Sequence, residues 1–314
     1  MNKYEPPAFL FNGHLQTIYP TLFRKFDTSF YTRERIDTQD GDFIDLDWSK
    51  VGSKKLVIIS HGLEGSSHRS YVVGMVKAAN SIGWDALAWN FRSCSGETNK
   101  KLQSYHNGST DDLAFVIDYA AKRKSYDEIA LVGFSMGGNV TLLHLGAEAK
   151  KVNSFVSKAV AFSVPMHLDS SSLTLARSSN KIYMNRFLKK LHKKIKVKMD
   201  MFPGQIDDKG YNGIKSFHHF DDRYTAPIHG FEDAKDYYNK CSSVFHLNKI
   251  EVPTLIVNAV NDPFLSDECY PIKKCEENRN LTFEIPQHGG HVGFPILGND
   301  YYWSELRVIK FLQN

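Results

Sequence analysis

The chain has 314 residues, 42% of them hydrophobic and 24% charged, and its formal net charge is +4. A chain of this length and composition can bury one large core and often forms a single domain with an insertion. Its four cysteines form no Cys-x-x-Cys pair, so the sequence indicates neither a zinc site nor a disulfide framework. The N-terminus lacks the apolar run of a signal peptide, and no apolar stretch approaches about 18 residues, so we expect a soluble cytoplasmic protein with reduced thiols.

Short apolar runs alternate with helical patterns along the chain. Apolar stripes at helical spacing over residues 71–79 and 113–120 predict two of the intervening helices. This alternation predicts an α/β fold with a mainly parallel central sheet flanked by helices. The expected strands span residues 43–48, 55–60, 85–90, 128–134, 158–164, 253–260 and 281–285.

A long interval separates the fifth and sixth expected strands. Residues 165–250 are too many for one crossover helix, so we expect them to form an inserted cap. The core is then made of residues 1–164 and 251–314. We expect the C-terminal part of the cap to pack on that core.

The expected cap contains a strongly basic segment at residues 177–198, with nine lysines and arginines and no acidic residue. Apolar residues in it recur at helical spacing, which predicts an amphipathic helix with the basic residues on a solvated opposite face. Weak peripheral contact with an anionic membrane, or attraction of anionic substrates, remains open. Nucleic-acid binding is not expected, because no recognition module accompanies the basic segment.

The sequence Gly-Phe-Ser-Met-Gly at residues 133–137 lies between the expected strand 128–134 and a helix-like stretch. A glycine-rich turn that happens to contain serine is the simpler interpretation. The flanking strand and helix favour a nucleophile elbow, in which a tight turn exposes the hydroxyl of Ser135.

A serine nucleophile needs a histidine base and an acid that orients it. Asp262 follows a buried strand at its C-terminal edge, so we expect it to be the acid; Asp267 and Asp169 are the competitors. Two histidines follow the last expected strand. Glycines on both sides permit close backbone approach better at His291 than at His288, so His291 is the expected base.

An oxyanion hole should combine two backbone N–H groups. The first belongs to Met136, directly after the serine. The second is expected from Leu63, in the His-Gly-Leu-Glu-Gly loop that follows strand 55–60. A plain turn after a strand is the competing interpretation.

Several polar residues stand beside apolar neighbours, namely His14, Gln16, Asp222 and His229. We expect buried hydrogen-bonding struts, although a role in lining a substrate pocket remains open. The adjacent histidines 218 and 219 lack the spacing of a metal-binding motif, so no cofactor and no catalytic metal are expected.

Five separated motifs, in order, resemble one family almost from end to end. They are residues 12–20 (Asn-Gly-His-Leu-Gln-Thr-Ile-Tyr-Pro), 61–66, 90–97, 225–231 and 288–294. Together they resemble the YheT-like branch of the α/β-hydrolases, also called AB hydrolase family 4. The resemblance implies a Ser-Asp-His triad and carboxylesterase or lipase-like activity on small esters or acylglycerols. Ser93 stands where the family loop has glycine, and Thr98 where proline is common.

The predicted reaction is serine acyl transfer to water. Ser135 attacks an ester carbonyl, His291 accepts its proton, and Asp262 orients the imidazole. A thioesterase or an amidase would use the same triad and differ only in its pocket. A non-catalytic ligand-binding protein on a hydrolase scaffold is the remaining possibility.

Overall fold

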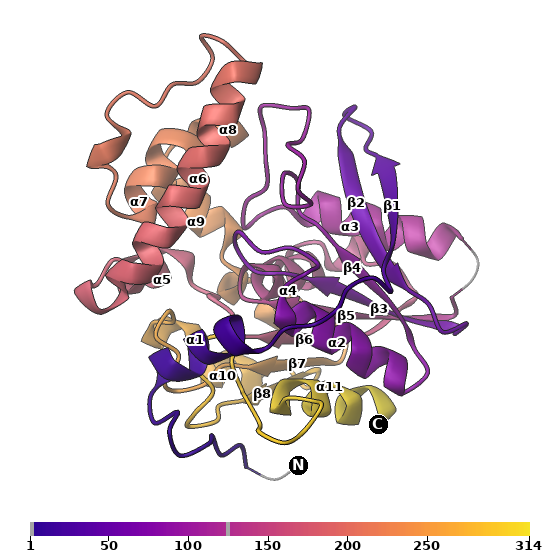
Figure 1. The fold of residues 1–314 in the computed structure, drawn as a ribbon. Helices are drawn as coiled ribbons and strands as arrows, with labels where there is room; N and C mark the ends of the chain where they lie inside the picture. Colours follow the sequence, from indigo (N-terminus) through magenta and orange to yellow (C-terminus); the bar gives the residue numbers. More distant parts are fainter. Residues whose placement is uncertain (1–2, 124–125) are drawn as a thin grey trace.

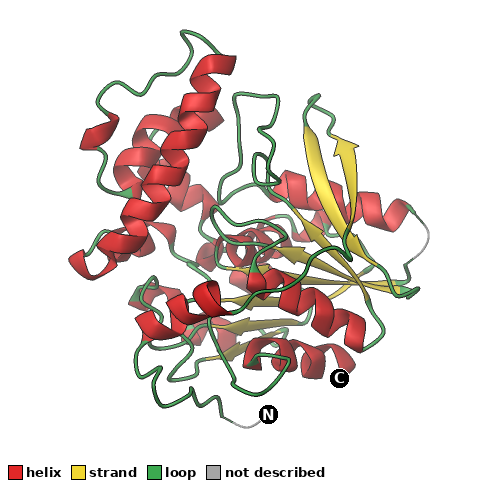
Figure 2. Cartoon of the chain, viewed as in Figure 1, coloured by secondary structure: helices red, strands yellow, loops and turns green. Residues whose placement is uncertain are grey.

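The computed structural model describes residues 3–123 and 126–314, and a sheet of eight strands forms its centre (Figures 1 and 2). The strand order is β1-β2-β4-β3-β5-β6-β7-β8. The β1/β2 and β2/β4 pairs are antiparallel and all others are parallel, so the predicted α/β fold is confirmed. The strands are β1 (Thr32–Asp37), β2 (Phe43–Ser49), β3 (Lys55–Ser60), β4 (Asp85–Trp89), β5 (Glu128–Phe134), β6 (Val156–Phe162), β7 (Thr254–Val257) and β8 (Leu281–Glu284).

The first strand, β1, has no counterpart among the predicted strands. Its sequence, TRERID, is largely charged and mostly exposed, so hydrophobic periodicity does not mark it. Arg33 and Arg35 reach across to Asp47 and Asp45 of β2, each at 2.8 Å. A charged edge strand of this kind also discourages pairing with other chains.

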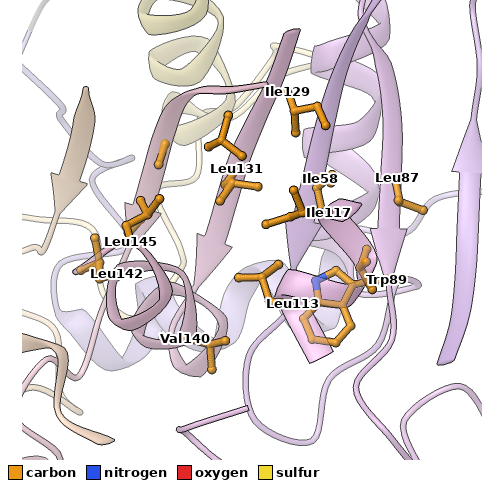
Figure 3. Packing of buried hydrophobic residues seen from close by; sticks show 14 of the residues in the cluster. Ile58, Leu87, Trp89, Leu113, Ile117, Ile129, Leu131, Val140, Leu142 and Leu145 are labelled. Carbon is orange, nitrogen blue, oxygen red and sulfur yellow. The ribbon is translucent and has the colours of Figure 1, made fainter. Parts of the chain in front are cut away.

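Alternate residues of the inner strands pack against two different helical layers. Ile58, Leu87 and Leu131 face one side of the sheet and form part of the larger apolar core (Figure 3). Ile59 and Val132 face the other side and form part of a second core. Burial on both faces explains why these strands are continuously apolar.

The helices of the two layers bear the predicted apolar stripes. Helices α3 and α4 cover the first face, and α2 and α11 cover the second. Helix α4 is buried on nearly all sides, since eleven of its twelve residues are buried. The helices outside the insertion are α1 (Gly13–Phe23), α2 (Ser70–Ser81), α3 (Thr110–Lys122), α4 (Met136–Ala147), α10 (Ile272–Glu276) and α11 (Trp303–Gln313).

The chain between β6 and β7 forms an all-helical cap to one side of the sheet (Figures 1 and 2). Helices α6 and α7 contribute to a separate apolar cluster, whereas α9 packs with Leu143 of α4. From these contacts we propose residues 165–250 as the cap and 1–164 with 251–314 as the core. The cap helices are α5 (Leu168–Leu175), α6 (Lys181–Met201), α7 (Phe217–Phe220), a π-helical turn at Asp221–Thr225, α8 (Ala226–His229) and α9 (Ala234–Cys241).

The basic helix α6 differs from its prediction. Its basic residues do not all lie on a solvated face, because Lys194 and Lys198 point toward the core. Lys198 is 4% exposed and its Nζ donates to both the backbone and the side-chain oxygen of Asn99, each at 2.8 Å. Burial lowers the pKa of Lys198 to about 8. The apolar spacing correctly predicted an amphipathic helix. It could not predict that some lysines point inward, because that depends on oxygen partners from distant parts of the chain.

No helix within the described ranges has the combination of length and apolar character needed to cross a membrane. The longest helix, α6, has 21 residues and carries many charges.

Candidate active site

Ser135 lies in a sharp turn between β5 and α4 with φ 53° and ψ −119°. This backbone conformation is strained for a residue with a side chain and is typical of functional turns. The flanking glycines allow the turn to close. A Cβ on Gly133 would lie 2.5 Å from the carbonyl oxygen of Gly137, and a Cβ on Gly137 would lie 2.3 Å from that of Ser60. Residues larger than glycine do not fit at either position.

The side chains of Ser135, His291 and Asp262 form one hydrogen-bonded series. His291 Nε2 lies 2.9 Å from Ser135 Oγ, and its Nδ1 lies 2.9 Å from Asp262 Oδ2. The Asp262 carboxylate is fully buried and also accepts a hydrogen bond from the backbone N–H of Phe264 at 2.9 Å. These contacts have the arrangement of nucleophile, base and orienting acid.

The competing residues of the sequence prediction lie elsewhere. Asp267 is exposed, and Asp169 lies in the first turn of α5. His288 is exposed, and its Nδ1 lies 3.5 Å from the side-chain nitrogen of Asn261. The structure therefore brings together Ser135 and the two preferred partners and leaves the three competitors outside.

The loop that carries His291 is held by residues for which the sequence predicted no individual role. Thr17 Oγ1 accepts the backbone N–H of His291 at 2.8 Å, and Ser163 Oγ accepts that of Val292 at 2.9 Å. The ring of Phe264 lies against the imidazole, with centroids 4.2 Å apart. No local sequence pattern predicts these contacts, because Thr17 and Ser163 are more than a hundred residues from the loop they hold.

Of the four residues expected to be buried struts, only Gln16 is buried; His14 and His229 are partly buried, and Asp222 is exposed. Gln16 is fully buried, and its Oε1 accepts the backbone N–H of Gly289 at 2.8 Å, so it is a strut beneath the histidine loop. Asp222 Oδ1 accepts the N–H of Ala234 at 2.7 Å. His14 Nδ1 is hydrogen-bonded to Tyr183 Oη at 3.2 Å. His229 lines a cavity, which is the alternative role considered for these residues.

The expected oxyanion donors flank the nucleophile. Neither the amide of Leu63 nor that of Met136 has a hydrogen-bond partner in the described part of the chain. A Cβ on Gly62 would lie 3.2 Å from the Cβ of Ser135, so this loop passes directly against the serine. Glu64, next to Leu63, has a positive φ of 53°, and its N–H donates to Tyr105 Oη at 2.9 Å. The free amides are available to a substrate oxygen.

Ser93 lies in the loop at residues 90–97, at the position where the family has glycine. Ser93 has a φ of 62°, the left-handed conformation that explains glycine at this position. Its Oγ donates to Asn99 Oδ1 at 2.6 Å and accepts the Asn99 N–H at 3.0 Å. These local bonds offset part of the cost of the left-handed conformation.

Two cavities meet at Ser135. The first has a volume of about 160 Å³, lies beneath the cap and is lined mainly by apolar side chains, among them Leu63, Phe187 and Phe217. The second has a volume of about 180 Å³ and lies between α1, the oxyanion loop and α6. A concave apolar site with few polar groups at its reacting centre is typical of small-molecule binding.

Residues 55–295 match the model of a family described as the alpha/beta hydrolase fold. This match, the doubly covered sheet and the serine turn show that the chain belongs to the α/β-hydrolases and is a hydrolytic enzyme. Within that family it belongs to the YheT-like branch. It is 35% identical to the YheT protein of Escherichia coli (strain K12) over 318 residues, which cover 99% of this chain and 93% of YheT.

Other relatives are similar over most of this chain. Phospholipase ABHD3 of Mus musculus is 30% identical, covering 87% of this chain and 70% of that protein. Monoacylglycerol lipase ABHD2 of Homo sapiens is 26% identical, covering 98% and 79%. Among solved structures, esterase Pf2001 of Pyrococcus furiosus superposes with a TM-score of 0.61 at 19% identity over 91% of this chain and 94% of that one. That likeness supports the fold.

Proposed function

We propose that this protein hydrolyses carboxylic esters of the short-chain or acylglycerol type through Ser135, His291 and Asp262. The observation that carries the proposal is the hydrogen-bonded series from Ser135 Oγ through the imidazole to the buried carboxylate. The names of relatives support an ester substrate, since YheT is assigned as an esterase and ABHD3 is named a phospholipase.

The reaction proceeds in two acyl-transfer steps. Ser135 Oγ attacks the ester carbonyl while His291 Nε2 accepts its proton, and the amides of Leu63 and Met136 stabilise the oxyanion. The imidazolium then protonates the leaving alcohol. Water, deprotonated by the same imidazole, hydrolyses the acyl-enzyme and restores the serine. Asp262 holds the imidazole in the tautomer that accepts at Nε2.

The first cavity supports a short acyl group. Its volume of about 160 Å³ is close to that of a cavity that holds one benzene molecule, about 150 Å³. An acyl chain of about six carbon atoms or fewer therefore fits without movement of the cap. Longer chains extend beyond this volume.

A series of p-nitrophenyl esters from acetate to palmitate tests this function. We expect kcat/KM to be highest for butyrate or hexanoate and to fall for longer chains. Ser135→Ala should abolish turnover and labelling by a fluorophosphonate probe while the far-ultraviolet circular dichroism is unchanged. Ser179→Ala, at an exposed serine of the cap, is the matched control and should retain both. Activity and labelling retained by Ser135→Ala would show that the nucleophile lies elsewhere.

Two weaker proposals concern location. Cytoplasmic localisation stays a prediction, supported by four buried cysteines that form no disulfide. Weak peripheral contact of residues 177–198 with an anionic membrane also stays a proposal. It is supported by Lys181, Lys189, Lys193 and Lys196, which remain on the exposed side of α6.

A further inference from the structure

The second cavity is rich in positive charge. Arg69, Arg186 and Lys190 line it, and Glu64 is its one acidic lining residue among those the structure describes. The Glu64 carboxylate is already engaged, because Lys194 lies 2.7 Å and Tyr105 Oη 2.6 Å from its Oε1. The cavity therefore has three cations and no unengaged carboxylate.

Helix α6 carries four cations in one row at a spacing of four residues, which places them on one face. The two farther along the helix have partners, since Lys194 is paired with Glu64 and Lys198 donates to Asn99. The two nearer its start face the second cavity. Arg186 has no hydrogen bond or ion pair within residues 3–123 and 126–314, and Lys190 donates only to a carbonyl.

The cations of the second cavity converge. Arg69 Nη2 and Lys190 Nζ donate to the same carbonyl oxygen of Glu64, at 2.9 Å and 3.0 Å. Burial lowers the pKa of the Lys190 ammonium, and the nearby charges of Arg69 and Arg186 lower it further. Like charges held together in this way are stabilised when an anion binds between them.

The positions of His291 and Met136 indicate which cavity receives the acyl group of an ester and which receives its alcohol. His291 lines the second cavity and is not part of the first, whereas Met136 lines the first. The imidazolium must protonate the departing alcohol oxygen, so the alcohol leaves on the side of His291. The acyl group then occupies the apolar first cavity, and the alcohol occupies the cationic second one.

We propose that the second cavity is an alcohol subsite that binds an anionic phosphate group carried by the leaving alcohol of the substrate, with Arg186, Lys190 and Arg69 as its ligands. The inference rests on the proposed function and names the substrate class of that site. The acyl-oxygen bond breaks, the alcohol leaves with the proton from His291, and water supplies the hydroxyl of the acid; the phosphate is unchanged. The phosphate can belong to a soluble ester or to a lipid headgroup.

Two soluble substrates that differ only in the phosphate test the subsite. They are 1-butyrylglycerol and 1-butyrylglycerol 3-phosphate, which share acyl group and scissile bond. We expect wild-type kcat/KM to be roughly tenfold or more higher for the phosphate ester, the effect of a charge-assisted contact made through the transition state. This preference should shrink as salt is raised, because ions screen the attraction. A second experiment presents the long-chain acylglycerol and its phosphate in vesicles of neutral phospholipid. Comparing the preference for the phosphate in the two experiments distinguishes a lipid headgroup from a soluble ester.

Variants of α6 assign the preference to residues. Arg186→Gln and Lys190→Gln should each reduce the ratio of the two kcat/KM values several-fold, and Arg186→Glu should reverse it. Lys189→Gln is the matched control, since Lys189 is exposed, lies on the same helix and does not line the second cavity. It should leave the ratio unchanged.

The outcomes separate this inference from the proposed function. Hydrolysis of both glycerol esters with no preference in either experiment would overturn the subsite and leave ester hydrolysis intact. An equal loss of the ratio in Lys189→Gln would also overturn it, because the preference would then reflect general surface charge. If neither glycerol ester nor any p-nitrophenyl ester is hydrolysed, the proposed function itself fails.

Discussion

The ammonium of Lys194 lies 2.7 Å from Oε1 of Glu64, and this ion pair joins cap helix α6 to the loop that carries Leu63. The Glu64 side chain is 5% exposed and that of Lys194 is 23% exposed. The Lys194 Nζ also lies 3.2 Å from the Sγ of Cys94. The position of the cap and the shape of the oxyanion loop are therefore coupled through one buried carboxylate.

Replacing Lys194 by methionine should leave the Glu64 carboxylate buried without its cation. We expect the free energy of unfolding to fall by about 2 kcal/mol, less than for a fully buried pair because Lys194 is partly exposed. We also expect kcat to fall, because Glu64 adjoins the Leu63 amide. Urea denaturation and p-nitrophenyl butyrate turnover measure the two effects.

Lys193→Met is the control for this prediction, since Lys193 is exposed on the same helix. The double variant Glu64→Gln with Lys194→Met removes both charges and should recover part of the lost stability. If Lys194→Met and Lys193→Met are equally stable, the ion pair contributes nothing measurable.

His291→Ala should lower kcat roughly a thousandfold or more, because members of a triad act as a unit. His288→Ala should change kcat less than about threefold, since His288 is exposed and its ring lies beside the side chain of Asn261. Steady-state kinetics on one soluble ester compares the two variants, with circular dichroism to show that both are folded. A larger loss in His288→Ala would move the base to that residue.

Gly62→Ala should reduce activity more than stability. The added methyl would lie 3.2 Å from the Cβ of Ser135 and 3.4 Å from Tyr71 Oη, so the loop must shift by a few tenths of an ångström. Such a shift displaces the Leu63 amide and should lower kcat roughly tenfold.

Gly213→Ala is the control for the glycine substitution. An added Cβ there meets no atom within 4 Å, and the backbone needs no positive φ. Its kcat and melting temperature should match wild type. Wild-type kcat in Gly62→Ala would show that the loop tolerates the methyl group and does not depend on this close approach.

Asp221 predicts a pH dependence of stability. Burial raises the pKa of this carboxyl to about 6, although Thr225 and Tyr238 donate hydrogen bonds to it. Between about pH 4 and 6 the folded protein holds a proton that the unfolded chain has released, so this residue lowers stability as pH rises through that window. Above about pH 6 the full cost of the buried carboxylate is present.

The variant Asp221→Asn should therefore gain stability relative to wild type as pH is raised from 4 to 7. Urea denaturation at pH 4, 5.5 and 7 measures the difference between the two proteins at each pH. Asp200→Asn, at an exposed residue of α6, should show no such trend. A difference for Asp221→Asn that stays constant with pH would contradict the raised pKa.

The sequence alone determined the inner strands of the sheet and the serine turn, because both depend on residues close together along the chain. Continuous apolar runs predicted the inner strands, and their burial on both faces confirms them. The glycines beside Ser135 predicted the turn because no larger residue fits there. The charged strand β1 was missed, since its stability comes from Arg33 and Arg35 pairing with β2.

The tertiary structure decided which groups meet. Hydrophobic periodicity predicted that α6 is amphipathic, but it placed every cation on the solvated face. The fold instead directs Lys194 to Glu64 and Lys198 to Asn99. Likewise, Thr17 supports His291 across 274 residues of sequence. Local patterns depend on the spacing of neighbours along the chain, whereas charge partners, cavities and the support of a catalytic loop depend on surfaces that meet only when distant segments pack.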